Sequence, residues 1–231
     1  VAFGNLNALR DALGPHVAAV MIEPVQGEGG ARQVPNGYIE GVRTAANEFG
    51  ALVIADEVQA GIGRTGTLFA FEDYGVKPDI IALAKGLGGG FPVGAVIASA
   101  AVGSAMTPGT HGSTFGGNPL AMAAAEVVLQ TLSAPGFMAD VQRRADYLEV
   151  GLRGLAKRYP EKITEIRGRG FLRGIGLGAD IDAVAFVGGL RDRHLLAVPA
   201  AQNTVRLLPP LVITEAEIDI VLDRLNAALA A

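Results

Sequence analysis

Lys85 stands where a lysine is unusual. It ends the apolar run 79–84 and opens the glycine cluster KGLGGG, whereas the other lysines of the chain lie in polar or proline-flanked sequence. Apolar surroundings disfavour the charged form of a lysine and lower its pKa. A neutral amine can attack a carbonyl carbon and bind it covalently. Lys85 is therefore a candidate nucleophile, beside glycines that let a bulky ligand approach the backbone, and the alternative is an ordinary surface lysine in a loop.

Asp56 is the second candidate, because it directly follows the apolar residues 51–55 and so starts out partly buried. A buried carboxylate needs a cationic or hydrogen-bonding partner, and a protonated pyridine nitrogen would serve. Gln59 could project to the same side if a turn forms after Asp56. An acid and a lysine at strand ends are what pyridoxal phosphate chemistry requires, since the lysine binds the cofactor and moves protons while the acid keeps the ring nitrogen protonated. The alternative for Asp56 is an ordinary acid after a strand.

The elements that carry these residues predict an α/β fold. Short apolar runs alternate with amphipathic helical patterns, which is typical of a mostly parallel sheet covered on both faces. In such sheets ligands bind beyond the carboxyl ends of the strands, which is where Asp56 and Lys85 stand. Gly50 is expected to end the helix that precedes the second strand. The expected strands are 17–23, 51–55, 79–84 and 94–99.

The pattern changes after about Ser133, and a second, smaller α+β unit is predicted. A long amphipathic helix is expected from Phe137 toward Tyr159, and a capping box at Thr214 opens a last helix. Between them we expect a helix over 184–193 and short strands at 163–167, 171–177, 195–199 and 204–208.

Composition excludes several classes of protein. The chain has 231 residues, half of them hydrophobic, a net charge of −4 and no cysteine. No basic tract points to nucleic acid, and disulfides, thiolate nucleophiles and cysteine-ligated zinc are excluded, which fits a cytoplasmic protein. The histidines are scattered, so no metal site is expected. No apolar run approaches the length of a membrane span, so no membrane partner is expected, and the start at Val1 suggests a fragment or a processed chain.

The stretch GIGRTG matches the dinucleotide-binding pattern GxGxxG, but its context does not. The glycines should follow a strand directly and open a helix. Here residues 56–60 intervene, and no helical pattern follows. We therefore set the nicotinamide-dependent alternative aside, and we expect Arg64 in this stretch to have a structural role.

Six ordered motifs carry a resemblance that spans essentially the whole chain. They are IEPVQGEGG, IADEVQAGIGRTG, KPDIIALAKGLGGGFPVGA, HGSTFGGNPLA, IRGRGFLRGI and VRLLPPL. Together they resemble the class III (subgroup II) aminotransferases of the pyridoxal phosphate fold type I. The resemblance implies that residues 1–134 are the C-terminal part of a large cofactor-binding domain and 135–231 a small C-terminal domain. The N-terminal part of that family's chain has no counterpart in this sequence.

The resemblance also implies roles for the cofactor-binding residues. Lys85 would form the Schiff base with pyridoxal phosphate, Asp56 would pair with the pyridinium nitrogen, and Gln59 would hydrogen-bond the phenolic oxygen. Thr114, with Ser113 beside it, would reach the cofactor phosphate of the neighbouring subunit, which implies a homodimer with shared active sites. Without the resemblance, turn formation beside glycines is the better explanation of Ser113 and Thr114.

Arg206 and Glu28 form a second implied pair. In the family this arginine binds the α-carboxylate of glutamate or 2-oxoglutarate through two hydrogen bonds. The glutamate covers the arginine while the other substrate reacts through its distal amine, so one site accepts two donors. Without the resemblance, a strand arginine paired with a structural acid is the better explanation.

The implied reaction moves the distal amino group of N2-acetylornithine to 2-oxoglutarate, in arginine biosynthesis, by a ping-pong route through pyridoxamine phosphate. The GEGG, KGLGGGFP and HGSTFGGNP motifs favour this donor within the family. Ornithine and 4-aminobutyrate are the alternative donors. A catalytically inactive binding homologue is the alternative from another class, although Lys85, Asp56 and Arg206 are all present.

Overall fold

The computed structural model describes residues 1–231, which divide into two compact units. Two short segments from the first half of the sequence belong to the unit formed by the second half. The expected division after residue 134 did not include them, because their partners are strands far along the chain. Unit 1 consists of Val1–Pro24, Val34–Gly63 and Thr67–Pro135, and unit 2 of Val25–Gln33, Arg64–Gly66 and Gly136–Ala231.

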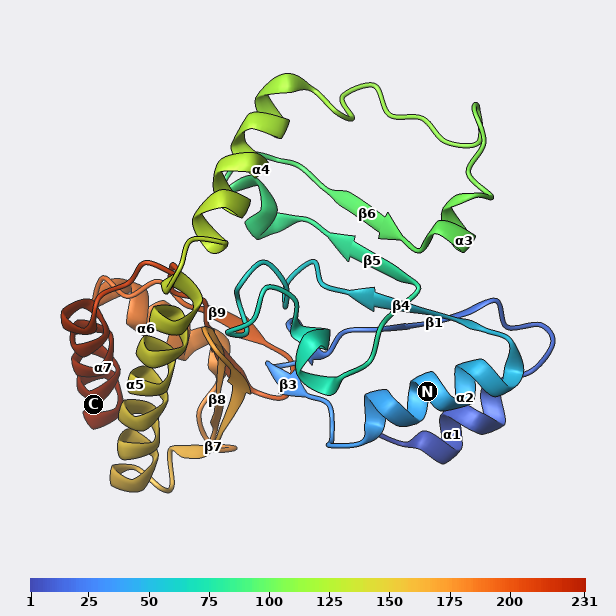
Figure 1. The fold of residues 1–231 in the computed structure, drawn as a ribbon. Helices are drawn as coiled ribbons and strands as arrows, with labels where there is room; N and C mark the ends of the chain where they lie inside the picture. The colour runs from blue at the N-terminus through green and yellow to red at the C-terminus, as the bar shows by residue number, and fades with distance from the viewer. The chain divides into compact units, whose positions relative to one another are not determined.

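Unit 1 is built on a four-stranded sheet with the order β1-β4-β5-β6 (Figure 1). The pairs β1–β4 and β4–β5 are parallel, and only the edge strand β6 is antiparallel to its neighbour. This confirms the mostly parallel sheet expected from the sequence. The strands are β1 Ala19–Ile22, β4 Leu52–Asp56, β5 Ile80–Leu83 and β6 Ala95–Ala98.

Helix α2 packs on β1 and β4, and α1 packs on α2. The apolar stripe of α2 is buried, including Ile39 and Val42. Gly50 ends α2 as expected, with a left-handed φ of 72° that lets its N–H reach the last turn of the helix. The helical elements of unit 1 are α1 Leu6–Ala12, α2 Tyr38–Phe49, η1 Ala70–Tyr74, η2 Lys85–Gly88, α3 Ala100–Gly103 and α4 Pro119–Leu132.

Asp79 ties α2 to both central strands. Its Oδ2 accepts the backbone N–H of Val53 at 2.7 Å and a hydrogen bond from Arg43 of α2 at 2.6 Å. These bonds to the ionised carboxylate, together with the positive charge of Arg43, hold the pKa of Asp79 below its ordinary value although burial acts in the opposite direction. The start of β5 is thereby fixed relative to β4.

The structure corrects one detail of the expected sheet, its cover on both faces. Val53 lies in the core beneath α2, but Met21, Val96 and Ile97 are exposed. Successive side chains of a strand point to opposite faces, so the helices α1 and α2 can bury only one set. Within residues 1–231, apolar strand positions therefore remain on the surface.

Unit 2 is a second four-stranded sheet, antiparallel throughout, with the order β7-β8-β10-β9. Helices α5 and α7 lie side by side and pack with α6 around one apolar core that includes Leu148, Leu152 and Phe171 (Figure 1). The predicted α+β unit is confirmed. Its elements are β2 Val25–Gln26, β3 Arg32–Gln33, α5 Phe137–Arg158, β7 Ile163–Arg169, β8 Leu172–Leu177, α6 Ala183–Asp192, β9 Val198–Ala200, β10 Thr204–Leu207 and α7 Glu215–Ala230.

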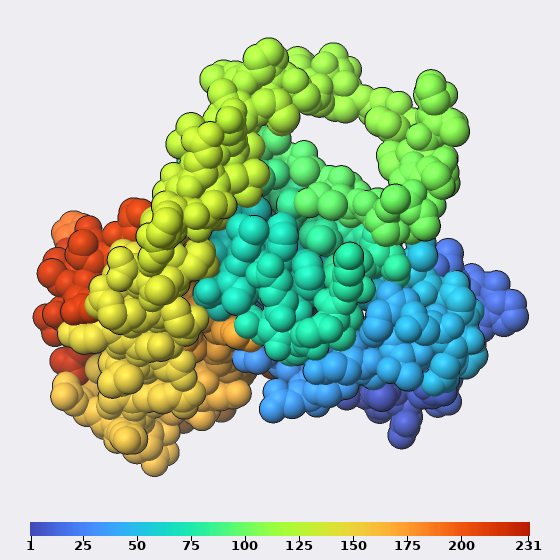
Figure 2. Space-filling model, in the orientation of Figure 1, coloured from blue at the N-terminus to red at the C-terminus, as the bar shows by residue number.

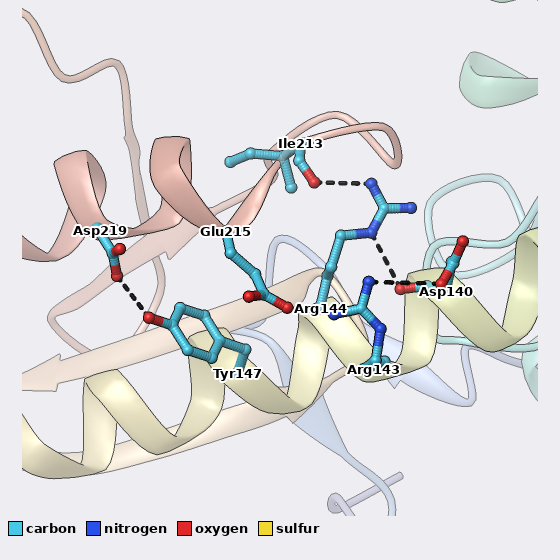
Figure 3. A network of polar contacts seen from close by, with 7 residues as sticks. All are labelled: Asp140, Arg143, Arg144, Tyr147, Ile213, Glu215 and Asp219. Atoms are coloured by element: carbon cyan, nitrogen blue, oxygen red, sulfur yellow. Dashed lines mark hydrogen bonds and ion pairs between the residues drawn. The ribbon is translucent and has the colours of Figure 1, made fainter.

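The first turn of α7 is held by polar contacts with α5 (Figure 3). Thr214 and Glu217 form the expected capping box. Arg144 of α5 donates to the carbonyl of Ile213 at 2.7 Å, and Tyr147 donates to Asp219 at 2.8 Å. The segment between β10 and α7 is therefore anchored at its far end.

No single helix combines the length and the low charge that crossing a membrane requires. Only α4 and α5 counted together, across the break between them, reach that length and composition. Much of the apolar face of α5 is buried in the core of unit 2.

Candidate functional site

The ends of β4 and β5 bring Asp56 and Lys85 to one edge of the sheet. The strands are parallel, Asp56 pairs with Ala82, and Lys85 follows three residues later. Paired strands lie about 4.8 Å apart, and three extended residues span about 10 Å at most. On these spacings the two backbone positions are at most about 15 Å apart.

Lys85 has a strained backbone and an exposed side chain. Its φ of 45° lies in the left-handed region, which costs a residue with a side chain about 1–2 kcal/mol. Its neighbours Leu83 and Leu87 are buried, whereas Lys85 is exposed. The expectation of apolar surroundings for this lysine is therefore wrong in this structure, because the apolar neighbours in sequence turn inward and the lysine turns outward. Strain of this kind is concentrated at functional sites.

The glycines after Lys85 make a tight turn. A Cβ on Gly88 would lie 2.8 Å from a methyl group of Val93, and Gly90 has a φ of 112°. A residue with a side chain would therefore be strained at Gly88 and Gly90, with or without a bound ligand.

Asp56 is half-buried, as expected, and a turn follows it. Its Oδ1 accepts the backbone N–H of Val58 at 3.0 Å, and the N–H of Gly61 donates to the carbonyl of Glu57 at 2.9 Å. Gln59 lies within this turn and is also half-buried. The turn that was needed to bring Gln59 toward the side of Asp56 is therefore present.

Glu57 is a residue whose role the sequence did not reveal. It is fully buried, and its two carboxylate oxygens accept the N–H groups of Ala70 and Phe71 at the start of η1, each at 2.9 Å. Burial raises its pKa to about 7, although the two hydrogen bonds act in the opposite direction. Adjacent strand residues alternate in direction, so two successive acids after a buried strand were a signal that one of them points inward.

Ser113 and Thr114 are exposed on the segment between α3 and α4. Figure 2 shows this segment spanning an open space, and residues 104–117 are exposed throughout. Asn118 closes the segment by donating to the carbonyl of Phe115 and by capping α4. No hydrogen bond joins Ser113 or Thr114 to Asp56 or Lys85, so within this chain the segment is not part of the strand-end pair.

Arg206 and Glu28 meet in unit 2. Arg206 Nη1 lies 2.8 Å from Glu28 Oε1; the arginine side chain is 5% exposed and that of the glutamate 74%. The structure thus brings together the two residues that the resemblance paired, 178 positions apart in sequence. Only the glutamate of this pair is exposed, so Glu28 can move into solvent, but the buried charge of Arg206 then needs another anion in its place.

The loop that carries Glu28 is fitted closely to the sheet. The carbonyl of Glu28 accepts the N–H of Ala201 at 3.1 Å. Gly174 pairs with Arg206 across the ladder, and a Cβ there would lie 2.8 Å from the carbonyl oxygen of Gly30. The backbone of the loop is therefore held in place while the Glu28 side chain stays in solvent.

No group of histidine, aspartate or glutamate residues within 1–231 is arranged to hold a metal ion.

Comparisons with known proteins agree over the whole chain. The profile of the family described as Aminotransferase class-III matches residues 2–229. Acetylornithine aminotransferase of Mesorhizobium japonicum is 49% identical over 227 residues, which are 98% of this chain and 56% of that protein. That of Brucella melitensis is 49% identical over 217 residues, 94% and 53% respectively. The chain thus spans about half the length of these curated relatives.

Solved structures give the same picture. The ornithine aminotransferase PY00104 from Plasmodium yoelii superposes with a TM-score of 0.93 at 33% identity, covering 100% of this chain and 61% of that one. The N-acetylornithine aminotransferase from Stenotrophomonas maltophilia K279a gives a TM-score of 0.90 at 39% identity, again covering 100% and 61%.

The titration of Glu57 predicts a pH-dependent stability. The pKa of Glu57 is about 7 in the folded chain and 4.5 in its unperturbed state. Between these two pH values Glu57 is protonated in the folded chain and ionised in the unfolded chain. The free energy of unfolding should therefore fall by up to about 3 kcal/mol as the pH rises through this window. In Glu57→Gln this part of the fall should be absent, as measured by urea unfolding at pH 5 and pH 7.

Glu126→Gln is the matched control, because Glu126 is an exposed acid of unit 1 that is not among the causes of the pKa shift of Glu57. It should keep the wild-type pH dependence. Parallel curves for wild type and Glu57→Gln would contradict the assignment.

Proposed function

Because the chain belongs to the aminotransferase class-III family, whose members depend on pyridoxal phosphate, we propose that it carries out amino-group transfer from the distal amine of N2-acetylornithine to 2-oxoglutarate, a step of arginine biosynthesis. The observation that carries the proposal is the parallel pairing of β4 with β5, which brings Asp56 and Lys85 to one edge of the sheet. The similarity to acetylornithine aminotransferases supports the choice of donor. Arg206 of unit 2, which can bind a carboxylate, supports 2-oxoglutarate as the acceptor.

The residues at the sheet edge fit the cofactor. An exposed lysine amine and a half-buried carboxylate are the two groups that its aldehyde and its ring nitrogen require. Asp56 would hold the ring nitrogen, Lys85 would bind the aldehyde carbon, and Gln59 would donate to the phenolic oxygen. When bound, pyridoxal phosphate withdraws electrons from the carbon that carries the substrate amino group.

The chain's own groups then handle the proton and the charge. Lys85, once released from the cofactor by the substrate, would move the proton at the reacting carbon. Asp56 would keep the ring nitrogen protonated, and its carboxylate is held in position because its Oδ1 accepts the N–H of Val58. The turn from Glu57 to Gly61 holds both Asp56 and Gln59 in place.

Arg206 and Glu28 would select between the two substrates. With Glu28 in place, the charge of Arg206 is covered, and a donor that reacts through its distal amine can bind. With Glu28 displaced, Arg206 can bind the α-carboxylate of glutamate or 2-oxoglutarate in a bidentate manner. The ion pair at 2.8 Å supports such a switch, because the exposed Glu28 can move into solvent when a substrate carboxylate takes its place on the buried Arg206.

The assembly and the division of the chain belong to the same proposal. Ser113 and Thr114 would serve the cofactor phosphate of a second subunit in a homodimer, for which their exposure is suitable. Residues 1–134 would belong to the large cofactor domain and 135–231 would be the small domain. A cytoplasmic location, and partners limited to small molecules and a second subunit, remain predictions from composition.

Ornithine is the second candidate donor, because ornithine aminotransferases are among the most similar structures. 4-Aminobutyrate is a third, from the sequence alone. An inactive binding homologue would still show the fold but would fail the labelling test that follows.

Lys85 should be the residue that binds the cofactor. The intact gene product is loaded with pyridoxal phosphate and reduced with borohydride, and the labelled peptide is mapped by mass spectrometry. The label should lie on Lys85 and disappear in Lys85→Arg, while Lys77→Arg, which changes another lysine of unit 1, should keep it. A label on any other lysine would overturn the site.

Donor preference tests the reaction. Under one condition, with 2-oxoglutarate as acceptor, kcat/KM for N2-acetylornithine should exceed that for ornithine and for 4-aminobutyrate by about tenfold or more, a difference of about 1.4 kcal/mol. A preference for either of the other donors would replace the proposed substrate and leave the reaction class intact.

Replacing Glu28 with alanine should reduce discrimination between substrates. Arg206 would then be permanently uncovered, so the ratio of kcat/KM for glutamate to that for the distal-amine donor should rise about fivefold or more, because a buried cation without its acid binds a substrate carboxylate more tightly. Glu165→Ala removes an exposed glutamate paired with Arg167 in the same unit and should leave the ratio unchanged. An unchanged ratio in Glu28→Ala would refute the switch.

A further inference from the structure

The segment Arg64–Gly66 is inserted into unit 2, although its neighbours in sequence belong to unit 1. Thr65 is fully buried there. The Arg64 guanidinium donates from Nη1 to the carbonyl of Pro209 and also lies 3.5 Å from that of Phe171, whose N–H in turn donates to the Arg64 carbonyl at 2.9 Å. Arg64 therefore joins the start of β8 to the segment that follows β10.

The fit around this segment is close. Gly170 has a φ of 56°, and a Cβ there would lie 2.4 Å from the backbone of Thr65. Burial lowers the pKa of Arg64 to about 10, which still leaves it charged at neutral pH. A buried charge is stable only when hydrogen bonds replace its water, so the position of the two carbonyl groups and that of the guanidinium depend on each other.

Pro209 lies just beyond the last backbone hydrogen-bonded pair of β10. The ladder between β10 and β8 ends at the pair Leu207–Arg173. Leu208 is exposed, and the next two residues, Pro209 and Pro210, have no N–H to donate. The backbone there can be held only through carbonyl oxygens, and Arg64 binds the first of them, three residues after Arg206.

We propose that Arg64 is a positioning residue for Arg206, which fixes the C-terminal end of β10 and so sets how Arg206 presents its guanidinium to a substrate carboxylate. This inference rests on the proposed role of Arg206 as the carboxylate-binding residue. The substrates affected are those that Arg206 binds, glutamate and 2-oxoglutarate, and the distal-amine donor is not among them.

Arg64→Lys tests the proposal in the intact gene product loaded with pyridoxal phosphate. A lysine keeps the charge but lacks the planar, rigid guanidinium whose Nη1 donates to the carbonyl of Pro209. KM for 2-oxoglutarate should rise about tenfold, since small misplacements of a binding group have effects of this size. KM for the distal-amine donor and kcat should stay within about twofold of wild type on the same reasoning.

Arg144→Lys is the matched control. Arg144 also donates to a backbone carbonyl of the segment after β10, but at its far end, on Ile213 (Figure 3). Both KM values should stay within about twofold of wild type there, because that bond lies beyond β10. An equal rise of KM for 2-oxoglutarate in both variants would overturn the proposal, because general loosening of the segment would then explain it.

A double-mutant cycle with Arg206→Lys separates this inference from the proposed function. If Arg64 acts through Arg206, adding Arg64→Lys to Arg206→Lys should raise KM for 2-oxoglutarate by less than about twofold. Additive effects, or a KM that is raised in Arg206→Lys but not in Arg64→Lys, would overturn the role of Arg64 and leave that of Arg206. An unchanged KM in Arg206→Lys would overturn both.

Folding is checked by circular dichroism and gel filtration. If Arg64→Lys does not fold, Arg64→Gln, which retains an amide donor, is judged by the same criteria. Failure of both variants to fold while Arg144→Lys folds would overturn the proposal, because Arg64 would then serve folding rather than Arg206.

Discussion

The parallel pairing of β4 with β5 is the constraint on which the candidate site depends. Because Asp56 lies opposite Ala82 in the ladder, β4 and β5 end at the same edge of the sheet. Asp56 and Lys85 therefore lie at that edge. Asp79 fixes the start of the same pairing through Val53 and the helix arginine Arg43. The strained backbone of Lys85 is tolerated because buried residues on either side of it hold the turn.

The two acids at the end of β4 show how one strand serves two purposes. Asp56 remains half-buried at the sheet edge, while Glu57 turns into the interior and receives two N–H groups of η1. Glu57, which points inward, holds the start of η1, and Asp56 remains accessible to a ligand. Alternation along a strand separates the supporting role from the chemical one within two residues.

Unit 2 combines rigid and loosely held parts around Arg206. The arginine itself lies within β10 and is almost fully buried, and the loop facing it is held by backbone contacts. The side chain of Glu28 is mostly in solvent, so a substrate carboxylate can displace it and compensate the buried charge of Arg206 instead. Beyond the ladder, arginine side chains replace backbone pairing, because a Pro-Pro segment offers only carbonyl groups. An exposed acid, Glu28, paired with a buried arginine, Arg206, is the arrangement that a substrate switch requires.

The sequence by itself determined the order of strands and helices, the acid and lysine at the strand ends, and, through its motifs, the pairing of Glu28 with Arg206. The elements and the strand-end residues follow from local patterns, namely apolar runs, caps and glycine positions, which act over a few residues. The pairing of Glu28 with Arg206 came from the resemblance to the family. Only the tertiary structure decided that Lys85 faces outward, that Glu57 is buried, and that Arg64 folds with the second half of the chain. The exposure or burial of each of these residues depends on which distant segment packs against it. The spacing of residues along the chain does not show which segment that is.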